Sequence, residues 1–357
     1  TSNQTESELF PFTIWTRTIR EVLNENQMQL MINPPCGGVF FLREAIAKHL
    51  KEFRGMTVLP EQIIVGAGTE YLYGLLIQLL GNEKIYAVEN PGYQKIGKIY
   101  QSYKVLCKYI DMDEEGVEIS KLEENQVDIA HISPSHHYPT GIVMPVSRRY
   151  ELLGWAAKSE NRYIIEDDYD SELRLSGQPI PTLQSMDVSD KVIYMNTFTK
   201  TLASTVRISY MILPRELVQQ YYKKLSFYSC TVSNFEQYTL AKFMEEGYFE
   251  KHINRLRNYY HNKRNTIVET IKKSRLNQYV SISGEEAGVH FLMKIETKKP
   301  QEQLMENAKA QGIKLSPLSA YYKENREEIQ NTYVMNYSSI ELEKIGKVVT
   351  RLVKCCE

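Results

Sequence analysis

The residues best suited to covalent chemistry lie in one short segment, residues 196–200, which follows an apolar run. Lys200 is preceded there by Thr197 and Thr199, and Arg207 follows seven residues later. A lysine whose pKa is lowered by burial can attack a carbonyl carbon and form a Schiff base. The two hydroxyl groups and the guanidinium could together bind a dianionic phosphate. Considered alone, the segment is equally compatible with a solvated lysine at the end of a strand.

Two further segments place small and aromatic residues where a strand gives way to a helix. In the first, Gly68 and Thr69 end a Val-Gly-Ala-Gly-Thr run, whose backbone N–H groups could meet an anion at a helix N-terminus. It lacks both the GxGxxG spacing of dinucleotide folds and the lysine of a P-loop, and alone is more typical of a tight turn. In the second, a Pro-Gly turn precedes Tyr93, whose ring could stack on a flat ligand. Considered alone, this segment is more typical of an ordinary turn with a half-buried tyrosine.

Four acidic residues cluster at the end of the apolar strand expected at residues 162–166. They are Glu166, Asp167, Asp168 and Asp170, and Tyr169 lies between the last two. Because neighbouring carboxylates repel one another, such a cluster is unfavourable unless a cation or a protonated ring nitrogen lies nearby. A divalent metal, a protonated heterocycle and a solvated acidic loop all remain open on this segment alone.

Together the four segments supply a phosphate cradle, a stacking ring, an acid for a ring nitrogen and a lysine for an aldehyde. These are the parts that a pyridoxal phosphate pocket needs, because an aspartate that keeps the pyridine nitrogen protonated lets the ring accept electrons. The parts form one site only if the segments share an edge of the fold. In doubly wound sheets, ligands bind at the carboxyl ends of the strands, and all four segments are expected there.

The first two thirds of the chain alternate short β-branched runs with helical patterns. Seven strands are expected at residues 62–65, 84–88, 103–110, 127–133, 162–166, 191–196 and 207–213, with helices at 69–80, 92–100 and 147–159. This alternation predicts an α/β fold with a mainly parallel, seven-stranded sheet.

The pattern changes after residue 213. Helices are expected at residues 217–227, 235–273, 302–311 and 340–353, and strands at 279–283, 289–295 and 332–337. We interpret residues 1–30 as an N-terminal arm and helix, 31–255 as a large cofactor-binding domain and 256–357 as a smaller C-terminal α+β domain.

Composition excludes several classes of protein. The 357 residues are 42% hydrophobic, enough for two domains with a sizeable core. Lysine and arginine total 43 against 44 acidic residues, which excludes a dominantly basic nucleic-acid-binding chain. Five cysteines without a CxxC pair indicate a reducing compartment. No signal peptide and no apolar run of the roughly 18 residues that a membrane span needs is present, so a cytoplasmic protein is expected.

The sequence resembles fold-type-I pyridoxal-phosphate proteins of the aminotransferase superfamily. More narrowly, it resembles the effector-binding domain of MocR-type regulators in the GntR family. The matching segments are FPFTIWTRTIREVL (10–23), GGVFFLREAIAKHL (37–50), IIVGAGTE (63–70), ENPGY (89–93), SPSHHYPTGIVMPVSRR (133–149), YIIEDDYDSELR (163–174), NTFTKTLASTVRISY (196–210) and LSPLSAYY (315–322). Each is weak alone, but the set keeps the family's order across nearly the whole chain.

The resemblance implies a role for each candidate residue. Lys200 would carry the internal aldimine of the cofactor, pyridoxal 5′-phosphate. Asp167 would face the pyridinium nitrogen, while Tyr169 would lie near the phenolic oxygen. Tyr93 would stack on the ring. The phosphate would be held by Gly68, Thr69, Thr197, Thr199 and Arg207.

The sequence departs from the aminotransferase pattern where the substrate is usually bound. Val334 occupies the position of the arginine that usually clamps an α-carboxylate, which argues against a plain α-amino acid as ligand. Lys95 and Arg43 are candidates for the missing charge, and both of them, with His137, are the candidates for effector binding. Tyr138 replaces a customary asparagine, and the neighbouring His137 is a candidate substitute for it. No third ligand accompanies the histidine pair of this segment, so no metal site is predicted.

The favoured interpretation is the effector-binding and oligomerisation domain of a MocR-type transcriptional regulator, sensing a small amino compound through the aldimine at Lys200. A winged helix-turn-helix module outside this chain would bind DNA, a homodimer is expected, and no membrane partner is expected. The alternatives are a stand-alone aminotransferase acting on an amino acid and a cofactor-free structural domain. Val334 favours the sensor, because a sensor needs only differential affinity between two states, whereas an enzyme must also stabilise a transition state.

Overall fold

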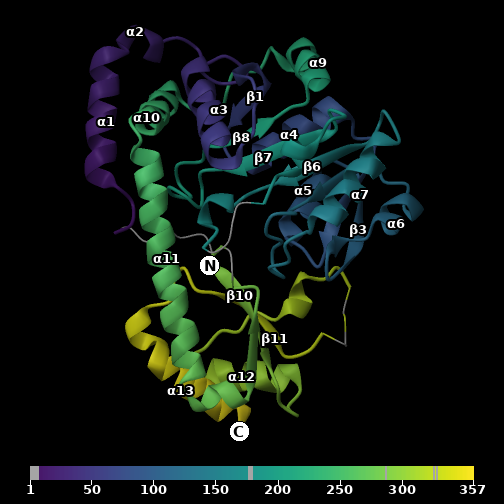
Figure 1. Ribbon diagram of the computed structural model, residues 1–357, viewed down its shortest axis with the longest axis vertical. Helices are drawn as coiled ribbons and strands as arrows, with labels where there is room; N and C mark the ends of the chain where they lie inside the picture. The colour runs from purple at the N-terminus through teal and green to yellow at the C-terminus, as the bar shows by residue number, and fades with distance from the viewer. Residues whose placement is uncertain (1–7, 176–179, 286–287, 325, 327–328) are drawn as a thin grey trace.

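A computed structural model describes the chain except for residues 1–7, 176–179, 286–287, 325 and 327–328, so the first seven residues of the expected N-terminal arm lie outside it. Its larger part is built on one sheet with the strand order β1-β8-β7-β6-β5-β2-β3-β4 (Figure 1). The strands are β1 (Ile63–Gly66), β2 (Ile85–Asn90), β3 (Leu106–Asp113), β4 (Gly116–Val117), β5 (Ile129–Ile132), β6 (Tyr163–Asp167), β7 (Val192–Thr197) and β8 (Ser209–Ile212). Neighbouring strands from β3 through β2, β5 and β6 to β7 are parallel, which confirms the mainly parallel α/β sheet.

The prediction of seven strands was one too few. The eighth strand, β4, is a two-residue edge strand that pairs antiparallel with the end of β3, and Asp113 lies opposite Gly116. Gly116 has φ +118°, a conformation that side-chain-bearing residues rarely adopt, and it closes the turn back onto β3. A strand of two residues is too short to produce a recognisable alternation of apolar and polar residues.

Helices cover both faces of the large sheet. Packed on one face are α4 (Thr69–Leu80), α5 (Gln94–Ser102) and α9 (Arg215–Leu225); on the other lie α3 (Phe40–Arg54), α6 (Ile119–Glu124), α7 (Val146–Ala157), α8 (Leu183–Met186) and α10 (Asn234–Glu245). The successive residues Ile164 and Ile165 of β6 belong to cores on opposite faces, and both are fully buried. Burial on both sides explains why these strands read as continuous apolar runs.

The smaller part is a three-stranded antiparallel sheet, ordered β11-β10-β9, packed against helices. It comprises β9 (Val280–Ser283), β10 (His290–Ile295), α12 (Gln301–Ala310), β11 (Thr332–Asn336) and α13 (Ile345–Cys356). Figure 1 shows the long helix α11 (Tyr248–Lys272) running from α10, beside the large sheet, down to α13. The domain division drawn from the sequence at residue 255 falls within this continuous helix.

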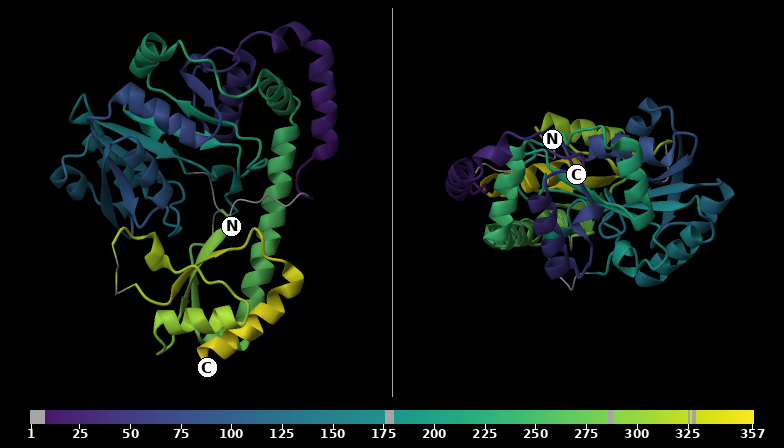
Figure 2. Two further views of the ribbon diagram at one scale, coloured as in Figure 1. Left: turned by 180° about the vertical axis from the view of Figure 1, so that it is seen from behind. Right: turned by 90° about the horizontal axis from the view of Figure 1, so that it is seen from above.

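The single helix expected at residues 235–273 is two helices. The break is at Gly247, whose φ of +71° lies in the left-handed region that glycine enters without strain, so α10 ends and α11 begins in a new direction. At the N-terminal end, α1 (Phe12–Glu25) and α2 (Gln27–Leu30) lie against α10 (Figure 2). Within the described ranges, no helix has the length and apolar composition needed to cross a membrane.

Candidate functional site

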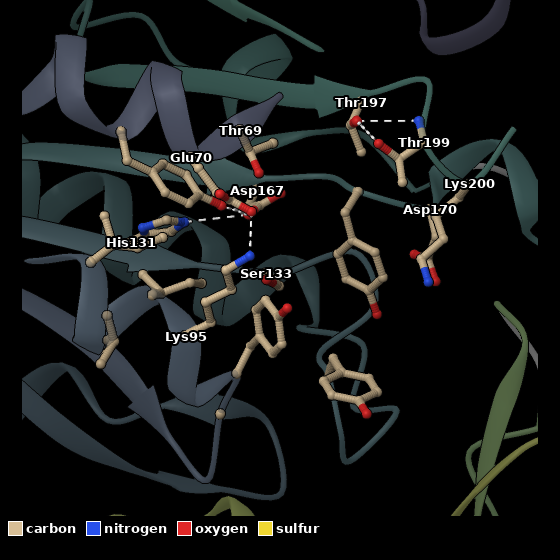
Figure 3. Close-up of a pocket in the computed structure, with 18 of the residues that line it drawn as sticks. Thr69, Glu70, Lys95, His131, Ser133, Asp167, Asp170, Thr197, Thr199 and Lys200 are labelled. Atoms are coloured by element: carbon tan, nitrogen blue, oxygen red, sulfur yellow. Dashed lines mark hydrogen bonds and ion pairs between the residues drawn. The ribbon is translucent and has the colours of Figure 1, made fainter. Parts of the chain in front are cut away.

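A cavity lies where β2, β5, β6 and β7 end, facing β10 and β11 of the small sheet. Nine of the residues singled out in the sequence line it: Thr69, Tyr93, Lys95, Asp167, Tyr169, Thr197, Thr199, Lys200 and Arg207. They come from four separate strand ends, and Figure 3 shows several of them pointing into one space. The convergence expected from a doubly wound sheet is therefore present.

Lys200 follows β7 by three residues, and its ammonium group is held in the cavity. Burial lowers the pKa of Lys200, while the negative charge of Asp170 acts in the opposite direction. Asp170 also lines the cavity, and its Oδ2 lies 2.8 Å from Nδ1 of His136. Because a lowered pKa raises the fraction of neutral amine, this environment favours a lysine that reacts as a nucleophile.

Asp167, the last residue of β6, is fixed by groups from two other elements. The Tyr73 hydroxyl of α4 donates to Asp167 Oδ2 at 2.8 Å, and His131 Nε2 of β5 lies 3.4 Å from the same oxygen (Figure 3). His131 Nδ1 in turn lies 2.7 Å from the Tyr100 hydroxyl. The other oxygen, Asp167 Oδ1, is buried without a hydrogen-bond partner among the described residues. A buried carboxylate oxygen without a partner is unfavourable unless a ligand donates to it.

Sequence reasoning missed His131, although strand register would have placed it. His131 lies opposite Ile165 of β6, and two residues along that strand, on the same face, lies Asp167. A histidine inside the apolar run Ile-Ala-His-Ile was the available signal.

Another part of the site gathers groups that could cradle an anion. Gly68 has φ +92°, and a Cβ at this position would collide with the guanidinium of Arg207. The Thr197 hydroxyl lies 2.8 Å from that of Thr199 and accepts a hydrogen bond from Ser209. Gly68 itself precedes the first turn of α4, whose unpaired N–H groups add to the positive potential.

Two tyrosines close the cavity on the side of the small domain. Tyr93 is half exposed, and its ring meets that of Tyr138 edge-on at 6.2 Å. The Tyr138 hydroxyl lies 2.9 Å from that of Tyr321, whose backbone carbonyl accepts from the Gly92 N–H. The segment around residue 321 therefore joins the small domain to the turn that carries Tyr93.

The three candidates for effector binding lie in different surroundings. Lys95 lines the cavity, and its ammonium group forms an ion pair with Glu70. His137 is buried behind the cavity, 2.6 Å from Thr140 Oγ1, and does not line it. Arg43 lies on α3 away from the cavity and donates to the Pro60 carbonyl and to Tyr222. Only the first of these side chains can meet a ligand in this conformation.

Glu89 is a further cavity residue that sequence reasoning did not single out. It accepts a hydrogen bond from the Ser133 N–H at 3.0 Å, and its other neighbour is His137 Nε2 at 3.5 Å. Burial raises the pKa of Glu89 to about 8. Burial also lowers the pKa of His137 to about 3. At neutral pH the two side chains therefore do not form a charged pair.

Replacing Glu89 by glutamine is expected to remove a pH dependence of the unfolding free energy. The folded pKa, about 8, lies above the ordinary value of 4.5, so the folded chain binds the proton more tightly. The contribution of Glu89 to the unfolding free energy therefore falls as pH rises through this interval, by a few kcal/mol at about 1.4 kcal/mol per pKa unit, and the variant lacks this loss. Urea unfolding at about pH 5 and about pH 9 measures it. Equal pH dependence of both proteins would contradict the assignment.

Comparisons with known proteins agree with this architecture. Residues 2–335 match the family model Aminotransferase class I and II. The chain is 38% identical to the uncharacterized HTH-type transcriptional regulator YdeL of Bacillus subtilis over 89% of its length, and 30% identical to the probable rhizopine catabolism regulatory protein MocR of Rhizobium meliloti, also over 89%. It spans 68% and 64% of these two regulators. A multiple substrate aminotransferase from Thermococcus profundus superposes with a TM-score of 0.84 at 25% identity, over 99% of this chain and 89% of that one.

The cavity fits the cofactor of this family, pyridoxal phosphate. The unpartnered Asp167 Oδ1 suits a ring N–H, the lysine suits an aldehyde, and the cradle at Gly68 suits a phosphate. No group of three metal-binding side chains occurs in the part of the chain that the structure describes. The chain belongs to the aminotransferase class I and II family, in the branch of the MocR-type transcriptional regulators.

Proposed function

We propose that this chain is the effector-binding domain of a transcriptional regulator, and that it senses an amino compound with pyridoxal phosphate bound at Lys200. One observation carries the proposal. The cavity has every group that the cofactor needs, whereas the strand that would carry a carboxylate-binding arginine has Val334 instead. When bound, pyridoxal phosphate supplies an aldehyde carbon that condenses reversibly with primary amines.

Different residues of the chain bind different parts of the cofactor. Lys200 supplies the amine that bonds to it, and Asp167 accepts the ring N–H through Oδ1, which has no partner among the described side chains and backbone groups. Tyr73 and His131 hold this carboxylate in place through its other oxygen. Tyr93 covers the ring, and Tyr169 lies near its phenolic oxygen.

The phosphate is assigned to the cradle at the start of α4. We propose that it is held by Gly68, Thr69, Thr197, Thr199 and Arg207. The cradle combines helix N–H groups, hydroxyl groups and a guanidinium, the donors that bind phosphate best.

We place DNA binding in the part of the regulators that this chain does not span, about a third of their length. Effector binding would then act at a distance, by changing the balance between two arrangements of the domain.

A homodimer is part of the proposal, and exposed apolar side chains at and after α2 mark a surface for it. Met28, Met31 and Ile32 are 78%, 76% and 64% exposed. Changing Met28 and Met31 together to lysine is expected to weaken the dimer at least about tenfold, because each change places a charge in a desolvated contact. Light scattering across a dilution series measures it, with Val188→Lys, at a 98% exposed position, as the matched control. A wild-type monomer, or a double variant as dimeric as the control, would contradict this surface.

Titration with pyridoxal phosphate tests the cofactor and ligand parts of the proposal. The chain is expected to give a saturable visible absorption band at one cofactor per chain, which a primary amine then shifts and holds shifted. Absence of saturable absorption would contradict cofactor binding. A band that no amine changes would contradict sensing.

A further inference from the structure

The cavity wall formed partly by the small domain carries a negative charge, from Asp170, and otherwise uncharged groups. One part of it is formed by Val289, just before β10, with His290 of β10 and Asn336 of β11, and another part by Tyr138 and Asp170. Lys200 and Asp170 lie side by side next to this wall, close to Thr199 (Figure 3). A ligand amine that reaches the cofactor must place the rest of its structure against this wall.

In the part of the chain that the structure describes, no cation on this wall other than Lys200 is placed to meet a ligand carboxylate. Among the described residues, the lysines and arginines that line the cavity are Lys95, Lys200 and Arg207. Lys95 is paired with Glu70, Arg207 lies over Gly68 in the cradle, and Lys200 is the proposed attachment point. The stretches of sequence outside the described ranges contain no lysine or arginine at all.

The strand position that would aim a cation at the ligand is apolar. Asn336 lines the cavity, and Val334, two residues earlier in β11, therefore lies on the same face of the strand. Val334 is buried opposite Leu292 of β10, as Asn336 lies opposite His290. An arginine at position 334 would point along this face towards the cavity.

The polar groups that remain are neutral or negative. Burial lowers the pKa of His290 well below its usual range, so its imidazole is neutral, and its Nε2 has no hydrogen-bond partner among the described residues. Asn336 uses its amide oxygen to accept from the N–H and hydroxyl of Ser338. Asp170 brings a carboxylate. A ligand carboxylate buried here would meet another anion. Within the described ranges, the one lining cation at this end is Lys200, whose pKa burial lowers.

From this wall we infer that the effector is a primary amine without a carboxylate, whose tail carries a second amine or a hydroxyl group. This inference rests on the function proposed above, because the amine is taken to bond to the cofactor at Lys200. The tail would donate hydrogen bonds to Asp170 and to His290 Nε2, the ring nitrogen that has no partner among the described residues. Exchange of one amine for another on the cofactor replaces one carbon–nitrogen bond by another, and it needs no oxidant or further reactant.

A matched four-carbon series tests the inference on the cofactor-loaded chain. The probes are putrescine, aminobutanol, γ-aminobutyrate and α-aminobutyrate, and the readouts are the shift of the visible absorption band and calorimetric affinity. Putrescine or aminobutanol is expected to bind at least about tenfold more tightly than either amino acid. Tighter binding of an amino acid, or no response to either carboxylate-free amine, overturns the inference. Failure of the proposed function is distinguishable, because the absorption band would then be missing before any amine is added.

Two substitutions sharpen the test. Asp170→Asn keeps an acceptor for His136 but removes the charge, so it should weaken putrescine about tenfold and aminobutanol much less. An equal loss of affinity for both amines would show that the charge of Asp170 does not contact the ligand. Val334→Arg supplies the missing cation and should reverse the preference towards the amino acids. If this variant keeps its absorption band and its preference for carboxylate-free amines, position 334 does not set the selectivity.

Discussion

Replacing Lys200 by alanine is expected to abolish covalent attachment of pyridoxal phosphate, with complete loss of the absorption band of the lysine-bound cofactor. Lys200 is the lysine that the structure places deep in the cavity with a lowered pKa, and a carbon–nitrogen bond to the cofactor requires an amine. The cofactor should still bind without the covalent bond, because the phosphate cradle remains, but with lower affinity. Borohydride reduction followed by mass spectrometry measures the covalent fraction.

Lys98→Ala is the matched control for this experiment. Lys98 is exposed on α5, one turn from the cavity residue Lys95, and does not line the cavity itself. Its substitution should leave reduction and labelling unchanged. Undiminished labelling of the Lys200→Ala protein would show that another amine holds the cofactor, and the site assignment would fail.

Replacing Arg207 by alanine is expected to weaken cofactor binding about tenfold to a hundredfold without abolishing attachment. A hydrogen bond from a charged donor contributes about 1.5–3 kcal/mol, which corresponds to that range of affinity. Arg207 lies directly over Gly68, and its guanidinium is 4.0 Å from Glu70, so its loss also leaves a carboxylate near the phosphate. Equilibrium titration gives the dissociation constant. Arg215→Ala, an exposed change on α9, is the control. Equal affinities of the two variants would contradict the phosphate assignment.

The convergence of the candidate residues at one edge of the sheet was predictable, because it depends on local sequence and on one rule of topology. Lys200, Asp167 and Thr69 each follow an apolar run, and parallel strands bring such positions to one edge. The expected third strand began at residue 103, but β3 begins at Leu106, because Lys104 has φ +60° and forms a turn. Such a positive φ at a lysine carries no signal in the sequence.

Contacts between distant segments were not predictable in the same way. His290 reaches the cavity from the small domain, and only the packing of the two sheets brings it near Asp170. The pairing of Lys95 with Glu70 depends on how α4 and α5 face each other. Arg43 and His137 were candidates because each lies close to a recognised motif, and only the tertiary packing shows that neither lines the cavity.

The distinction between sensor and enzyme is tested most directly by turnover. The chain loaded with pyridoxal phosphate is mixed with a responsive amine and a keto-acid acceptor, and carbonyl product is counted over hours beside the absorption spectrum. The account predicts a lasting shift of the absorption band and no more than one equivalent of carbonyl product per chain. Steady formation of many equivalents, with the original band restored each time, would show an aminotransferase and contradict the sensor.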